Sequence, residues 1–213
     1  MGIEDKIKSM HLDILKEIGN IGAAHAATSL SILLNKKIEM NVPKVSIESF
    51  SEMMELAGGS ENVVSCVLLR IEGEASGYMF FILPLQQSEK FIRQMTGDEH
   101  FSFDQPTVSE LGISAFQELG NILAGSYLTA LSDFTNLDLY PSVPQLSIDM
   151  FGAIISHGLI ELSQTSDYAI VIDTRLSDEQ AEYDQTMNGQ FFLLPNPDSF
   201  ETIFQALGVG LHE

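Results

Sequence analysis

Apolar and polar positions along the chain follow an order of elements that occurs twice. Each half begins with a long helical pattern, continues with a strand segment, a short helix and two strands, and ends with a helix. In the first half these elements span residues 3–34, 37–50, 51–59, 63–73, 76–84 and 88–97. In the second half they span residues 106–131, 137–151, 152–159, 168–176, 189–195 and 199–208. Because the order lacks regular βαβ alternation, it predicts an α+β fold with a mainly antiparallel central sheet.

The two halves are also related residue by residue. Residues 17–50 and 118–151 align at a constant offset of 101, with 14 identities in 34 positions, including EIGNIGA against ELGNILA. An acidic insertion over 177–188 separates the last two strands of the second half. No linker rich in Pro, Gly or Ser divides the halves. Two copies are too few for a solenoid. We therefore expect one pseudo-two-fold domain over 1–213, made of repeats at about 1–100 and 101–213.

The polar residues common to both copies form one stripe on each long helix. At 100° per residue, an acidic or hydroxyl residue, a glutamate and an asparagine fall within a narrow sector, and apolar residues occupy other sectors. A proline follows each asparagine after 23 residues. Since proline cannot donate to a strand ladder, it indicates an edge position or a bulge. The two sets are Asp13, Glu17, Asn20 and Pro43, and Ser114, Glu118, Asn121 and Pro144.

Composition narrows the possible partners. Apolar residues make up 45% of the chain and charged residues 19%, which is typical of a folded globular protein. The net charge of −20 argues against nucleic acid and anionic membranes as partners. Cys66 is the single cysteine, so no intramolecular disulfide can form. The N-terminus does not resemble a signal peptide, and no apolar run approaches the ~20 residues that span a bilayer. We expect a cytoplasmic protein with no membrane insertion.

Common catalytic and metal-binding patterns are missing. The five histidines occur singly, without metal-ligand spacing, and no nucleophile elbow, phosphate-binding loop or dinucleotide motif occurs. His25 lies on the apolar side of its helix, which predicts a packed core residue. The polar stripes could be merely the solvated faces of two amphipathic helices. The retention of Glu and Asn in both copies beside changed neighbours favours a functional site.

The duplicated pattern Asp/Ser-x3-Glu-x2-Asn-x22-Pro resembles that of the CheC family of bacterial chemotaxis phosphatases, which includes the CheC, CheX and FliY types. The likeness extends over essentially the whole chain, and it implies a duplicated CheC-like fold whose two long helices carry the sites. It also implies hydrolysis of the aspartyl phosphate on the response regulator CheY. The regulator would hold the Mg²⁺ ion, so the resemblance implies neither a cofactor nor a metal site of the chain's own.

The resemblance also implies the roles of the stripe residues. Asn20 and Asn121 would each orient the attacking water, and Glu17 and Glu118 would anchor the regulator by pairing with a basic residue. An uncharged carboxamide suits this task, because it can hydrogen-bond a water without repelling the phosphoryl oxygens. Positioning of this kind can contribute several kcal/mol, with an upper bound of about 7–11 kcal/mol.

Two other readings remain open for this family resemblance. The chain could act mainly as a binding module for the receptor deamidase CheD, as a monomer or as a heterodimer with it. That contact would lie around 149–156, involving Asp149, Phe151 and Gly152, although a plain surface turn explains the segment equally well. A structural role in the flagellar switch would need a further C-terminal module, for which the chain leaves no room after Glu213. The CheX type is shorter and carries one such site per chain.

Overall fold

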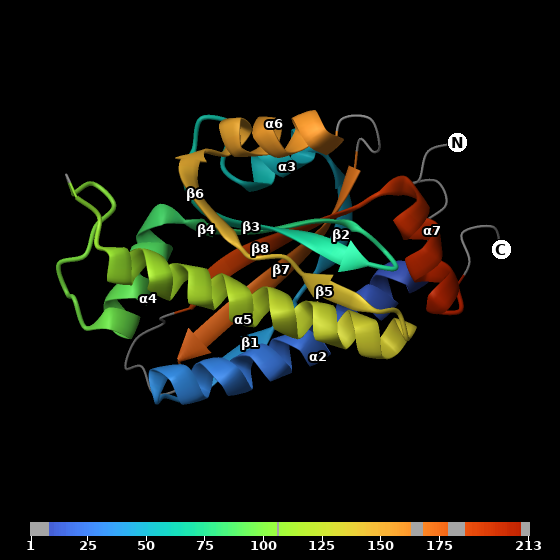
Figure 1. Ribbon diagram of the computed structural model, residues 1–213, viewed down its shortest axis with the longest axis horizontal. Coiled ribbons are helices and arrows are strands. Elements are labelled where there is room, and N and C mark those ends of the chain that lie inside the picture. Colours follow the sequence, from blue (N-terminus) through green and yellow to red (C-terminus); the bar gives the residue numbers. More distant parts are fainter. Residues whose placement is uncertain (1–8, 106, 163–167, 179–185, 210–213) are drawn as a thin grey trace.

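The computed structural model describes residues 9–105, 107–162, 168–178 and 186–209. It contains one antiparallel sheet of eight strands between two layers of helices (Figure 1). The predicted α+β class and mainly antiparallel sheet are confirmed. The predicted first turns of the long N-terminal helix and most of the acidic insertion over 177–188 lie outside the described residues.

Strands from the two halves are interleaved in this sheet. Its order is β1-β7-β8-β4-β3-β5, with β2 also paired to β7 and β6 also paired to β3. The outer strands of the first half, β1 and β2, therefore pair with β7 of the second half, and the outer strands of the second half, β5 and β6, pair with β3 of the first. The strands are β1 (Ile38–Asn41), β2 (Val45–Ser49), β3 (Val63–Gly73), β4 (Gly77–Pro84), β5 (Leu139–Pro141), β6 (Gln145–Met150), β7 (Tyr168–Asp178) and β8 (Met187–Pro195).

Two long helices cover one face of the sheet and two shorter ones cover the other. Figure 1 shows α2 (Ser9–Leu34) and α5 (Glu110–Thr135) side by side and running in opposite directions. On the opposite face lie α3 (Phe50–Leu56) and α6 (Phe151–Leu162), while α4 (Leu85–Thr96) and α7 (Pro197–Ala206) flank the long pair. A large core fills the space between the sheet and the long helices, and a smaller one lies beneath α3 and α6.

The second long helix begins and ends later than the predicted 106–131. The side-chain oxygen of Ser109 caps its first turn by accepting a hydrogen bond from the Gly112 amide. At the other end Asn136 adopts a left-handed conformation, with φ of 55°, and terminates the helix. Asn35 has φ of 50° at the end of α2, so the same residue type closes both long helices.

Each predicted proline irregularity is a bulge on an outer strand. Between the pairs Asn41–Arg175 and Val45–Ile172, the outer strand has three residues where β7 has two. The second half repeats this count between the pairs Pro141–Ile71 and Gln145–Leu68. Pro43 and Pro144 both lie inside these bulges, which bend the strand and leave a residue unpaired in the ladder. The expectation of an edge position or a bulge is confirmed.

The prediction for His25 was wrong. His25 is exposed, whereas His11 is 2% exposed. Nε2 of His11 lies 3.1 Å from the carbonyl oxygen of Val209. The buried side of α2 is the side that faces the sheet and α5, and His25 lies outside it. His11 also packs edge-on against the ring of Phe204. It thereby joins the first long helix to the end of the last helix.

Candidate functional site

The first polar stripe lies on the solvent side of α2. Asp13 and Glu17 are exposed, and neither side chain has a hydrogen-bond or ion-pair partner among the described residues. Asn20 is half-buried, and both ends of its carboxamide are engaged. Its Nδ2 donates to the carbonyl oxygen of Lys16 at 3.1 Å, and its Oδ1 accepts from the amide of Val42 at 2.9 Å. The first asparagine is therefore held in a defined orientation.

The second polar stripe, on α5, is more open. Ser114, Glu118 and Asn121 are all exposed. Within the described part of the chain, none of their side chains makes a hydrogen bond or an ion pair. Asn121 is thus free to rotate, although it occupies the same position in its repeat as Asn20. Every residue of the two stripes is thus exposed except Asn20, so the two asparagines differ.

The difference arises in the bulge beside each helix. Val42 is 2% exposed, packs beneath α2 and points its amide at Asn20. Its counterpart Val143 is 84% exposed. In the second bulge Ser142 bonds the backbone of Arg70 instead. The Arg70 amide donates to Oγ of Ser142 at 2.9 Å, and the Ser142 amide donates to the Arg70 carbonyl at 2.9 Å. This serine clamp holds the second bulge in a different conformation.

The glycine before each asparagine lets its helix approach the sheet. A Cβ on Gly120 would lie 2.4 Å from Cγ1 of Val67, inside the normal contact distance. A Cβ on Gly19 would lie 3.3 Å from Cγ2 of Val42. Gly22 serves the helix pair instead, because a Cβ there would lie 2.9 Å from Cα of Tyr127 on α5. All three glycines therefore lie where a long helix closely approaches a neighbouring element.

The polar contact of Tyr127 fixes α5 to the sheet. Its hydroxyl lies 3.1 Å from Oγ1 of Thr174 on β7, and both groups are buried. Burial raises the pKa of Tyr127 to about 12, and the hydrogen bond to Thr174 opposes that rise. The phenol is therefore neutral at physiological pH and acts as a fixed tie between α5 and β7.

The described residues form neither a metal-binding cluster nor a membrane-spanning helix. No group of three or more His, Cys, Asp or Glu side chains is placed to hold a metal ion within 9–105, 107–162, 168–178 and 186–209. None of the helices in these ranges is long and apolar enough to cross a membrane. Chemically, each stripe presents carboxylate and carboxamide or hydroxyl groups on a rigid helix. Such a stripe can accept a basic partner group and hydrogen-bond a water.

The residues that the family resemblance assigns to a contact with CheD lie partly on the surface and partly in the interior. Asp149 is exposed at the end of β6, and its Oδ1 accepts the amide of Met150 at 2.7 Å. Phe151 is fully buried and packs against Phe192 with ring centroids 5.6 Å apart. The amide of Gly152 donates to the carbonyl of Ser60. Direct contact with the Phe151 ring would require α6 to lift from the sheet.

Comparison with known proteins places this arrangement in a family. The model of the CheC-like family matches residues 10–47 and 111–148, which contain the two stripes and the two bulges. The chain is 49% identical over 211 residues to the CheY-P phosphatase CheC of Bacillus subtilis (strain 168), covering 99% of this chain and all of that protein. The chain belongs to the CheC-like family.

Solved structures share the CheC-like fold at low sequence identity. Thermotoga maritima FliY has a TM-score of 0.70 and 20% identity, over 95% of this chain and 98% of that one. CheX in a complex of CheX, CheY, BeF3 and Mg²⁺ from Borrelia burgdorferi has a TM-score of 0.50 and 18% identity, over 82% of this chain and 96% of that one. At these identities the likeness concerns the fold alone.

Sequence reasoning missed one residue that shapes the site of this CheC-like chain. Val42 acts through its backbone amide, which no side-chain pattern reveals. A signal was nevertheless present, because Val-Pro occurs at the same spacing after each asparagine. That spacing indicated a fixed distance between helix and strand. It did not indicate that the two valines would differ in burial.

Proposed function

We propose that this chain hydrolyses the phosphoryl group of phosphorylated CheY, using one site on each long helix. The observation that carries the proposal is the 49% identity over nearly the whole length with a CheY-P phosphatase. The geometry is consistent with it, because both stripes lie exposed on rigid helices where a second protein can reach them. Acceleration would come from positioning and electrostatics, the usual sources of catalysis in phosphoryl transfer.

In this mechanism the asparagine carboxamide orients the attacking water. Asn20 already uses one Nδ2 proton and one Oδ1 lone pair on Lys16 and Val42. One donor and one acceptor position therefore remain for a water. Asn121 has all of its hydrogen-bonding positions available within the described residues. Its orientation would become fixed when the regulator binds.

The exposed glutamates would fix the regulator in register. Glu17 and Glu118 each lie three residues before an asparagine, so each shares a helix face with it. A carboxylate there can pair with a lysine or arginine of the regulator. The net charge of −20 would favour approach by a basic surface, most strongly at low ionic strength. Asp13 and Ser114 would extend the same edge by one turn.

We further propose that the regulator, and not this chain, holds the Mg²⁺ ion of the reaction. The possible metal ligands of each stripe support this, because a stripe offers only two or three exposed side chains, all on one helix. Magnesium prefers carboxylates together with substrate phosphate oxygens in octahedral geometry. When bound in the regulator, the ion would neutralise charge on the phosphoryl group. The residues of this chain would add only the oriented water and the anchoring contacts.

The test is phosphate release from purified phosphorylated CheY with site variants. Asn20→Asp keeps the acceptor for Val42 but loses the amide donor, and Asn121→Ala truncates the second site. We expect each change to lower the rate and the double variant to show no acceleration above CheY alone. Phe134→Ser, an exposed position at the end of α5, serves as a control that should retain the rate. Full acceleration by the double variant would refute the two-site assignment.

A second candidate function is docking of the deamidase CheD, either alongside catalysis or as the main role. One observation favours it. Asp149 is exposed and lines a surface depression together with Ser142 and Val143, two of the three residues of the second bulge. A protein docked there would touch the segment beside the second site. Loss of CheD co-purification in Asp149→Lys, with CheY-P hydrolysis retained, would support docking; unchanged co-purification would exclude this surface. We propose a cytoplasmic monomer or a CheD heterodimer as the working form.

A further inference from the structure

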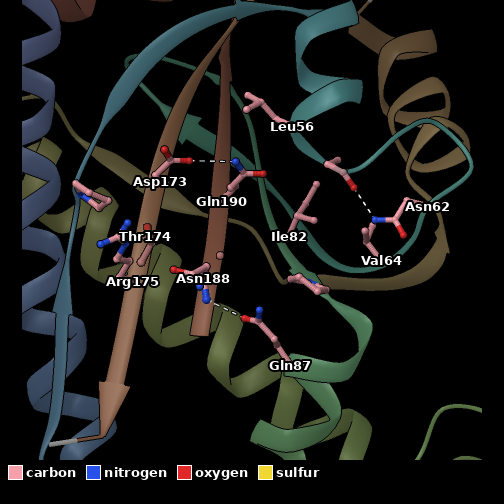
Figure 2. Close-up of a pocket in the computed structure, with 14 residues that line it drawn as sticks. Leu56, Asn62, Val64, Ile82, Gln87, Asp173, Thr174, Arg175, Asn188 and Gln190 are labelled. Atoms are coloured by element: carbon pink, nitrogen blue, oxygen red, sulfur yellow. Dashed lines mark hydrogen bonds between the residues drawn. The ribbon is translucent and has the colours of Figure 1, made fainter. Parts of the chain in front are cut away.

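The face of the sheet opposite the long helices contains a cavity with charged residues that no step of the proposed reaction uses. Its volume is about 350 Å³, within the range of small-molecule sites. Figure 2 shows its two sides. Leu56, Val64 and Ile82 provide apolar surface, and polar side chains of β7 and β8 provide the other wall. These polar side chains are Asp173, Arg175, Asn188 and Gln190.

Two opposite charges on the polar wall are not paired with each other. Asp173 and Arg175 lie two positions apart on β7, so their side chains point to the same face of the sheet. Their Cα atoms are about 7 Å apart along the strand. Oδ1 of Asp173 accepts Nε2 of Gln190 at 3.0 Å, and its Oδ2 has no partner among the described residues. The Arg175 guanidinium likewise makes no hydrogen bond or ion pair with any described residue. Among the described residues, the cavity therefore presents an unpaired guanidinium and one unpaired carboxylate oxygen.

The other half of the chain shows that this arrangement is particular to one repeat. Arg70 is the eighth residue of the 11-residue strand β3, as Arg175 is of the 11-residue strand β7. Arg70 is already engaged, because its Nε donates to the hydroxyl of Tyr78 at 3.2 Å. Its guanidinium also lies 5.5 Å from the ring of Tyr78. The sixth position, occupied by Asp173 in β7, is Leu68 in β3. Within the described part of the chain, β7 and not β3 combines an unpaired guanidinium with a carboxylate.

We propose that this cavity binds a small zwitterion with an apolar side group, such as an apolar amino acid. A guanidinium is suited to a carboxylate, which it can bind through two parallel hydrogen bonds. Oδ2 of Asp173 would accept from the ligand ammonium group. Leu56, Val64 and Ile82 would pack against the apolar side group. Both ligand charges and the apolar group thus have a place, and a simple anion would leave the carboxylate uncompensated.

The same cavity adjoins the segment that holds the first asparagine. Pro43 lines it, and the preceding residue, Val42, gives its amide to Asn20. Proline fixes its own φ and restricts the backbone conformation of the residue before it. A displacement of Pro43 should therefore also move Val42. Occupancy of the cavity would therefore alter the hold on Asn20. An effect of the ligand on CheY-P hydrolysis rests on the proposed function of Asn20, whereas binding of the ligand to the cavity does not.

Binding can be tested on the full chain without any activity measurement. The ¹⁵N-labelled protein is titrated with L-leucine, N-acetyl-L-leucine and L-leucinamide at millimolar concentrations. We expect L-leucine to shift the backbone signals of Asp173, Arg175 and Gln190. The two blocked compounds, each lacking one charge, should bind at least about tenfold more weakly. No shift with L-leucine, or equal binding of all three compounds, would overturn the zwitterion site.

A matched pair of variants locates the site. Arg175→Gln should weaken L-leucine binding by about tenfold or more, whereas Arg70→Gln, at the same position of the other repeat, should leave it unchanged. Equal effects would overturn the assignment to Arg175. The coupling has its own readout, since L-leucine should also shift the Val42 amide and the Asn20 side-chain NH₂ signals. Static Val42 and Asn20 signals at saturation would overturn the coupling, whatever the phosphatase assays show.

Discussion

The backbone amide of Val42 donates a hydrogen bond to Oδ1 of Asn20 across 2.9 Å. This bond joins an edge strand of the sheet to the helix that carries the first stripe. Val42 is buried, so its amide has no access to water in place of the asparagine. Asn20 is therefore a structural residue as well as a candidate catalytic one. The second half has no such bond between Val143 and Asn121.

This asymmetry predicts different effects of alanine at the two asparagines. Asn20→Ala leaves the buried Val42 amide without a partner and should lower the free energy of unfolding by about 1–3 kcal/mol. Asn121→Ala removes an exposed side chain without contacts and should change it by no more than about 0.5 kcal/mol. Urea denaturation followed by circular dichroism measures both values. Equal destabilisation would show that the Val42 bond contributes nothing to stability.

The Asn20→Asp variant separates the structural role from the chemical one. An aspartate keeps an oxygen that can accept the Val42 amide, so most of the stability should remain. It loses the bond from Nδ2 to the Lys16 carbonyl, and its charge would repel phosphoryl oxygens. We expect a folded protein with an impaired first site. If Asn20→Asp unfolds as readily as Asn20→Ala, the two roles are not separable in this way.

Two glycines of α5 should respond oppositely to alanine. A Cβ at Gly120 would lie 2.4 Å from Val67, so Gly120→Ala must push the helix from the sheet, at a cost of about 1–3 kcal/mol. A Cβ at Gly125 would meet nothing within 4 Å beyond the backbone of its own helix and the adjacent residues, so Gly125→Ala should stabilise by about 0.5–1 kcal/mol through helix propensity. Thermal denaturation of both variants checks this. The same sign for both would contradict the close approach at Gly120.

The single thiol should report on unfolding. Cys66 is fully buried on β3, and burial raises the pKa of its thiol above the usual range. The reactive thiolate is therefore scarce in the folded protein, and the sulfur is shielded from reagents. Iodoacetamide should leave the native chain unmodified and label it fully in denaturant. Rapid labelling under native conditions would mean that β3 opens readily.

The interleaved sheet predicts one unfolding transition. Strands β1 and β2 pair with β7, and β5 and β6 pair with β3, so each half keeps only its own central hairpin, β3–β4 or β7–β8, when the other unfolds. We expect circular dichroism and tyrosine fluorescence to follow one coincident transition in urea, as for a single cooperative domain. Two separated transitions would indicate that the halves at about 1–100 and 101–213 are independent domains.

Much of the fold could be predicted from local patterns. Helical periodicity located both long helices, and alternation located the strands, because burial imposes a period of 3.6 or 2 on each element. The errors arose where packing decides. His25 was expected in the core, but the buried side of α2 is set by its contacts with both α5 and the sheet. The end of α5 was missed because it depends on the left-handed conformation of Asn136.

The sequence by itself determined that the chain is duplicated, that each long helix carries a polar Glu–Asn stripe, and that a proline interrupts the strand that follows. These properties depend on residue type and spacing, which are visible in a linear chain. Only the tertiary structure decided that Asn20 is tied to Val42 while Asn121 is free. The two bulges have similar sequences but different neighbours. Ser142 clamps one of them to Arg70, and such a contact between distant residues exists only after folding.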